Sequence, residues 1–193
     1  MSLLPSSLPT LLLFALLVAA VWHDVRARRI PNAVVFPGAL AGIALHALLP
    51  AGAGLFGTPM GSLGILSALG GLALGLAILL PMYALRLMGA GDVKLLAMVG
   101  AFAGAGQILA IALLSLLAGG VLALVFAAWQ GKLRQLSTNA YQMMVASGIG
   151  ALGGEIAVAR PAVASGRLPY AVAIAAGTVP CVLWLHFVGA LPL

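Results

Sequence analysis

The stretch Met88-Gly89-Ala90-Gly91-Asp92-Val93-Lys94 places a carboxylate and a lysine between two long apolar runs. The chain uses acidic residues very sparingly, since Asp24, Asp92 and Glu155 are its only three. A charged group is costly to hold in lipid, so an ionisable residue at a membrane segment commonly serves function. Asp92 is therefore the first candidate functional residue.

The composition is typical of an integral membrane protein. Of the 193 residues, 64% are hydrophobic and 6% are charged, whereas a soluble domain carries about 25% charged residues. The apolar runs are continuous and do not alternate, which favours helices over a β-barrel. We expect a single polytopic domain over residues 1–193. The one cysteine, Cys181, excludes an internal disulfide and a four-cysteine zinc site, and we expect neither metal nor cofactor.

Apolar runs separated by charges, prolines and glycines predict an all-α bundle of six transmembrane helices. The expected spans are residues 8–22, 32–49, 62–85, 92–103, 108–129 and 168–188. Residues 130–166 form the longest stretch that is not convincingly transmembrane. Within it, residues 132–147 have a helical periodicity that suggests a helix lying on the membrane surface.

The basic residues support this topology. All nine fall in three connections, after the first span, between the third and fourth, and after the fifth: Arg26, Arg28, Arg29, Arg86, Lys94, Lys132, Arg134, Arg160 and Arg167. Basic residues near span ends mark the cytoplasmic side, so both termini are expected outside. The net charge of +6 then reflects cytoplasmic loops, and we expect no nucleic-acid partner.

The same topology puts two acids at one depth in the bilayer. Asp24 lies where the first span leaves the membrane on the cytoplasmic side, and Asp92 lies where the fourth span enters from that side. Packing of these two spans would bring the carboxylates together. Two close carboxylates cannot both ionise at low cost, so one keeps a proton. Such a pair can act as base and acid at once, which is aspartyl protease chemistry.

Simpler interpretations exist for each acid. Asp92 could serve merely as the N-cap of the fourth span, with no chemical role. Asp24 opposes the macrodipole of its own helix, and it could merely pair with the arginines that follow, which contributes about 0–1 kcal/mol when exposed. A functional alternative is a small ion-coupled transporter that uses Asp24 and Asp92 as proton or cation sites. A carrier should hold its acids near the midplane and often has two related halves, and the sequence indicates neither. A catalytically silent assembly scaffold is a weaker alternative.

The residues around the two acids resemble a known family. Gly89-Ala90-Gly91-Asp92 fits the G-x-G-D motif of intramembrane aspartyl proteases. Asp24, followed after five residues by Ile30-Pro31-Asn32, resembles the other half of the type IV prepilin peptidase signature. Val93-Lys94-Leu95 and Arg167-Leu168-Pro169-Tyr170 are also similar to that family. The resemblance extends in order from the first span to the sixth.

The resemblance implies a multi-pass peptidase of the bacterial inner membrane, with Asp24 and Asp92 as its catalytic residues. Its partners would be membrane lipids and a prepilin or pseudopilin substrate, which loses a short basic leader at the cytoplasmic face before pilus or secretion-system assembly. Many bacterial relatives also methylate the new N-terminus and carry an insert with two C-x-x-C pairs. This chain has no cysteine before Cys181, so we expect proteolysis without N-methylation. The short form looks most like the tight-adherence (Flp) pilus peptidases, and archaeal preflagellin peptidases are also short.

Several further residues are candidates for binding substrate or shaping the loops. Gly89 and Gly91 would let a substrate backbone approach closely, although loop flexibility explains them equally well. Lys94 could hold a substrate carboxylate or extend to the headgroups. Pro31 and Asn32 would shape the loop after Asp24, or form an ordinary turn. The outer-face histidines, His46 and His186, are expected far from the aspartates.

Overall fold

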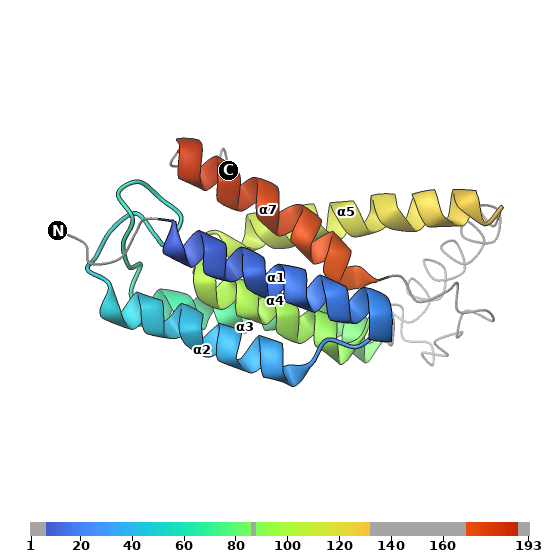
Figure 1. Cartoon of the computed structure of the whole chain (residues 1–193), viewed down its shortest axis with the longest axis horizontal. Coiled ribbons are helices and arrows are strands. Elements are labelled where there is room, and N and C mark those ends of the chain that lie inside the picture. The colour runs from blue at the N-terminus through green and yellow to red at the C-terminus, as the bar shows by residue number, and fades with distance from the viewer. Residues whose placement is uncertain (1–6, 86–87, 132–168, 189–193) are drawn as a thin grey trace, which may run out of the picture. The chain divides into compact units, whose positions relative to one another are not determined.

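The computed structural model describes residues 7–85, 88–131 and 169–188. These residues form helices and contain no strand: α1 (Leu8–Ala27), α2 (Asn32–Leu48), α3 (Ile65–Ala84), α4 (Ala90–Ala103), α5 (Ile108–Trp129) and α7 (Tyr170–Val188) (Figure 1). The all-α prediction is confirmed for this part of the chain. The chain divides into two units, residues 1–119 with 169–193 and residues 120–168, and the boundary falls inside α5. The expected single domain over residues 1–193 stays a prediction.

Four of the described helices, α1, α3, α5 and α7, are long and apolar enough to cross a membrane. α2 is a shorter apolar helix of 17 residues, and α4 has 14 residues. At 1.5 Å per residue α4 is roughly 21 Å long, less than the hydrocarbon thickness of about 30 Å. A multi-pass membrane protein is thus supported, while six spans with both termini outside stay a prediction. The predicted surface helix at 132–147 lies outside the described residues.

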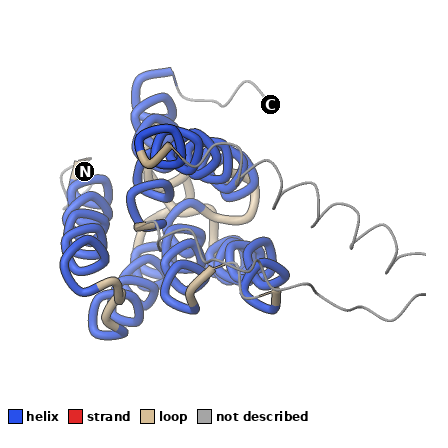
Figure 2. Tube along the Cα trace, turned by 90° about the vertical axis from the view of Figure 1, so that its right-hand side faces the viewer, coloured by secondary structure: helices blue, strands red, loops and turns tan. Residues whose placement is uncertain are grey.

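α4 lies among the other helices of the first unit, as labelled in Figure 1, and Figure 2 looks roughly along several helix axes, which therefore run alongside one another. α4 packs against α1, α2, α3 and α7. Its residues from Leu95 to Ala103 are buried without a break. A surface helix buries only one stripe, so a helix enclosed on every side has to be apolar all round. The run Leu95-Leu96-Ala97-Met98-Val99 meets that requirement, and the charged residues of α4, Asp92 and Lys94, both come before this run.

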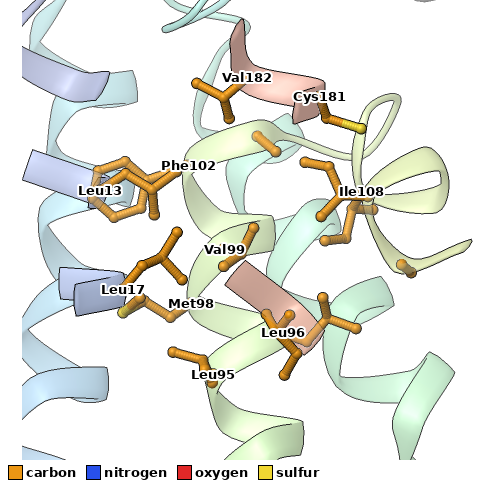
Figure 3. Packing of buried hydrophobic residues seen from close by; sticks show 14 of the residues in the cluster. Leu13, Leu17, Leu95, Leu96, Met98, Val99, Phe102, Ile108, Cys181 and Val182 are labelled. Atoms are coloured by element: carbon orange, nitrogen blue, oxygen red, sulfur yellow. The ribbon is translucent and has the colours of Figure 1, made fainter. Parts of the chain in front are cut away.

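Large apolar side chains join α4 to α1 and α7 (Figure 3). Leu13 and Leu17 of α1, Met98 and Phe102 of α4, and Val182 of α7 belong to one cluster. None of these side chains is more than 2% exposed. The position of α4 relative to α1 and α7 is therefore set by close side-chain packing.

α3 approaches α4 through glycines, with backbone against backbone. A Cβ added at Gly71 would collide with the carbonyl of Gly100, and one added at Gly100 would collide with the carbonyl of Gly71. One turn further on, a Cβ added at Gly75 would lie 2.6 Å from the carbonyl oxygen of Leu96. Small residues four apart let membrane helices approach this closely.

His46 ties the far end of α4 to the connection between α2 and α3. Its Nε2 lies 3.1 Å from the carbonyl oxygen of Phe102, and its Nδ1 accepts from the N–H of Leu63 at 3.1 Å. A carbonyl only accepts and an amide only donates, so the imidazole is neutral with its hydrogen on Nε2. His46 therefore lies near the C-terminal end of α4, and Asp92 lies roughly 15 Å away along that helix, as expected from the sequence.

α3 begins later than the predicted residue 62, at Ile65. The hydroxyl of Ser62 donates to the carbonyl of His46 and accepts from the N–H of Gly64. Gly64 itself has φ +89°, a value that helices do not contain. The residues before Ile65 therefore form hydrogen bonds that hold the connection between α2 and α3, and they are not part of the helix.

Gly100→Ala tests the close packing of α3 on α4. Alanine is the better helix former by about 1 kcal/mol, yet the collision with Gly71 should lower the free energy of unfolding by about 2 kcal/mol or more. Gly120→Ala is the matched control, since an added Cβ there meets no described atom within 4 Å. Thermal unfolding in detergent measures both. Equal stability of the two variants would contradict the packing described here.

Candidate active site

Asp24 lies near the C-terminal end of α1 and is 8% exposed. The helix continues five residues beyond the apolar run predicted to end at Trp22, and it ends where Arg28 adopts φ 51°. The N–H of Arg28 donates to the backbone carbonyl of Asp24 at 2.8 Å. The Asp24 carboxylate is thus carried by regular helix and not by a loop.

A hydrogen bond from the last helix holds the Asp24 side chain. The N–H of Ala171 donates to Asp24 Oδ2 at 3.1 Å. α7 begins at Tyr170, so this amide belongs to the first turn, where N–H groups have no acceptor within the helix. Pro169 before it has no side-chain acceptor to offer. Asp24 therefore caps α7, and the α7 macrodipole favours its negative charge although that of α1 opposes it.

Asp92 is the third residue of α4 and is 9% exposed. Its Oδ2 accepts from the N–H of Gly89 at 3.1 Å, and its own N–H donates to the Gly89 carbonyl at 3.2 Å. This is the half of a capping box that the third helical residue supplies; glycine has no side chain to supply the other half. Asp92 therefore does cap α4 as predicted, but it does so from the third helical position, and the N-cap residue is Gly89.

The structure brings the two carboxylates within range of each other's charge. Each uses Oδ2 for its backbone hydrogen bond, so Oδ1 of each takes no part in these bonds. Arg28 also lies within electrostatic range of Asp24. Two like charges in a poorly solvated site repel strongly unless one of them is protonated. The arrangement therefore suits a carboxyl pair that shares one proton.

Lys94 and Asn32, two of the predicted supporting residues, contact each other directly. Lys94 Nζ donates to Asn32 Oδ1 at 3.1 Å and lies 5.3 Å from the centre of the Phe36 ring. The contact joins the start of α4 to the start of α2. Asn32 is exposed and Lys94 is partly exposed, so the bond contributes little to the stability of the fold.

The glycines of the motif and Pro31 shape the surroundings of the aspartates. A Cβ added at Gly91 would lie 3.1 Å from Cβ of Ile30, in the connection between α1 and α2. A Cβ added at Gly89 would lie 3.3 Å from Asp92 Oδ2. Pro31 is the N-cap residue of α2 and has extended backbone. The connection after Asp24 therefore packs onto the start of α4, where a side chain at Gly91 would crowd it.

The described residues contain no group of three or more His, Cys, Asp or Glu side chains that could hold a metal ion. Glu155 and most of the loop after α5 lie outside the described part of the chain.

The sequence indicated Pro169 and Tyr170 only as part of a motif, and it did not predict the contact of Ala171 with Asp24. One signal in the sequence could have indicated this contact: the start of the last predicted span has no side chain that could cap it.

Replacements of Asp24 separate its capping role from its charge. Asp24→Asn should keep the fold, because the amide oxygen still accepts from Ala171. Asp24→Leu leaves that buried N–H without an acceptor and should lower the free energy of unfolding by about 1–3 kcal/mol. Thermal unfolding in detergent compares the two. If Asp24→Leu were as stable as Asp24→Asn, the bond to Ala171 would contribute nothing to holding α7.

Both aspartates lie within the region that a protein-family model matches. The model of the type IV leader peptidase family matches residues 11–124, more than half of the chain. The matched range includes Asp24 and Asp92 and ends before α7. Among curated proteins and among solved structures, no match was found. The chain belongs to the type IV leader peptidase family.

Proposed function

We propose that the chain is an aspartic prepilin peptidase that cleaves the short basic leader of type IV or Flp-type prepilins at the cytoplasmic membrane face. The observation that carries the proposal is the pairing of Asp24 and Asp92, which are far apart in sequence but within range of each other's charge. The family match supports a leader peptidase in general terms, and the pair supplies residues able to do the chemistry.

In the proposed reaction one ionised carboxylate takes a proton from a water molecule, and the water oxygen attacks the scissile carbonyl carbon. The protonated carboxyl of the other aspartate donates to the carbonyl oxygen as negative charge develops there. The carboxyl that took the water proton then passes it to the leaving amine as the C–N bond breaks, and the hydroxyl formed on the carbonyl oxygen returns its proton to the other aspartate, so the pair regains its one shared proton. This scheme is that of aspartic proteases in general.

The surroundings favour Asp24 as the base and Asp92 as the acid. The Ala171 amide and the N-terminus of α7 stabilise a negative charge on Asp24, and the Arg28 guanidinium acts in the same sense. Among the described residues, Asp92 accepts one hydrogen bond, from the N–H of Gly89. The shared proton therefore belongs on Asp92 before the water attacks the scissile carbonyl.

The substrate class and location follow the same proposal. The substrate is a prepilin or pseudopilin, and the enzyme is a multi-pass protein of the bacterial inner membrane in contact with its lipids. The lack of paired cysteines supports cleavage without N-methylation, and the resemblance to peptidases without the cysteine-bearing insert favours an Flp-type substrate. No nucleic acid, metal or cofactor enters the reaction.

The ion-coupled carrier is the second candidate. A carrier would hold its acids near the middle of its spans, whereas Asp24 lies in the last turns of α1 and Asp92 in the first turn of α4. The family match also favours a peptidase over a carrier.

Co-expression with an Flp-type prepilin tests the proposal. Asp24→Asn and Asp92→Asn should each lower leader removal by about 10³-fold or more, because each removes a group that transfers a proton. Mass spectrometry of the pilin N-terminus measures the cleaved fraction. Tyr83→Phe, at an exposed position of α3, is the control and should cleave normally. Processing that persists in either asparagine variant would rule out the pair. Loss of proton flux through liposomes in those variants would instead favour the carrier.

A further inference from the structure

The first two residues of α7 lie close to both aspartates. The N–H of Ala171 bonds to Asp24, and the Tyr170 phenol is within electrostatic range of Asp92. Neither residue falls in the range matched by the family model. The start of α7 is thus a third element of the site, beside α1 and α4.

The Tyr170 ring is seated on α5 at Gly119. A Cβ added at Gly119 would lie 2.6 Å from Tyr170 Oη, 2.8 Å from its Cζ and 3.2 Å from its Cε1. Room for an added Cβ therefore requires the whole Tyr170 ring to move, because the ring is rigid and cannot bend away from the contact. At the adjacent Gly120, an added Cβ meets no described atom within 4 Å.

α5 and α7 make a second close approach further along. A Cβ added at Gly177 would collide with the backbone nitrogen and the hydroxyl of Ser115. The Ser115 hydroxyl lies 2.7 Å from the Ile111 carbonyl oxygen and 3.4 Å from that of Ile174. α7 therefore rests on α5 at two points, which restrict both its tilt and its position along its own axis.

We propose that Tyr170 is a positioning residue of the active site: seated on Gly119, it holds the first turn of α7 where the Ala171 amide orients Asp24 toward Asp92. The inference rests on the proposed peptidase function. A shift of about 1 Å in a catalytic group can cost up to 10²-fold in rate. Displacement of this turn should therefore slow the chemical step while leaving substrate binding nearly unchanged.

The test compares Gly119→Ala with Gly120→Ala, purified in detergent and assayed on an Flp-type prepilin. Both changes bring the same gain in helix propensity, so their difference isolates the contact with Tyr170. Gly119→Ala should lower kcat on the order of 10- to 100-fold, with KM within about twofold. Gly120→Ala should match the unmodified enzyme. Equal kcat for the two variants would overturn the inference.

A double-mutant cycle identifies Tyr170 as the residue through which Gly119 acts. Tyr170→Leu alone should lower kcat, and adding Gly119→Ala to it should cause little further loss, because the atoms that collide are gone. Additive losses would overturn the inference. Should Gly119→Ala prevent folding, Tyr170→Leu against Tyr83→Leu decides, since Tyr83 is 46% exposed. A lower kcat in the first alone supports the inference, and equal kcat overturns it.

These outcomes are separate from the test of the proposed function. If Gly119→Ala were fully active while Asp24→Asn were inactive, the role of Tyr170 would be disproved and the proposed peptidase function would be retained. Cleavage by Asp24→Asn would instead remove the aspartate pair, and with it the reason for positioning Asp24.

Discussion

The position of Asp92 is set by the packing of α1, α2, α3 and α7 around α4. Glycine contacts with α3 draw one side of α4 close, and apolar side chains of α1 and α7 hold the other. The C-terminal end is fastened by His46 at Phe102 and by the Ser67 hydroxyl at Ala105. Because this helix cannot slide, a residue in its first turn has a defined position relative to α1 and α7.

The polar bonds that complete the fold are also the ones that orient the aspartates. Asp24 caps α7, and Asp92 bonds back to the N-cap of α4. Each bond engages Oδ2 and leaves Oδ1 outside these bonds, so a capping role and a chemical role are compatible. A site whose groups are held in place before the substrate arrives avoids reorganisation during the reaction. The structural explanation of each acid therefore supports the catalytic one.

Much of the fold could be predicted because it depends on local pattern. Continuous apolar runs and their breaks indicated α2 and α5 to within a residue of their observed ends. The start of α3 was missed because hydrogen bonds from Ser62 and Leu63 to His46 of α2 hold the residues before it, and hydropathy does not indicate such bonds. Hydropathy ended the first run at Trp22, while the helix itself continues to Ala27, since polar residues can also be helical.

The site could be predicted only in part. The predicted topology puts Asp24 and Asp92 at the same depth, which stays a prediction, and the Gly89 spacing could have indicated a capping bond. The bond between Ala171 and Asp24, and the seat of Tyr170 on Gly119, join segments whose approach no local pattern encodes. Such contacts depend on how the helices pack, which the sequence expresses only through small residues such as Gly119.

The most direct test of the account is cross-linking within one chain, in membranes, between cysteines placed at positions 24 and 92 by Asp24→Cys and Asp92→Cys. Cys181 is buried and free, so Cys181→Ser removes it from the experiment. We expect a short bifunctional thiol reagent to join positions 24 and 92, and not positions 46 and 92 in a His46→Cys control. Failure to join 24 and 92, with efficient joining of 46 and 92, would contradict the pairing of the two aspartates.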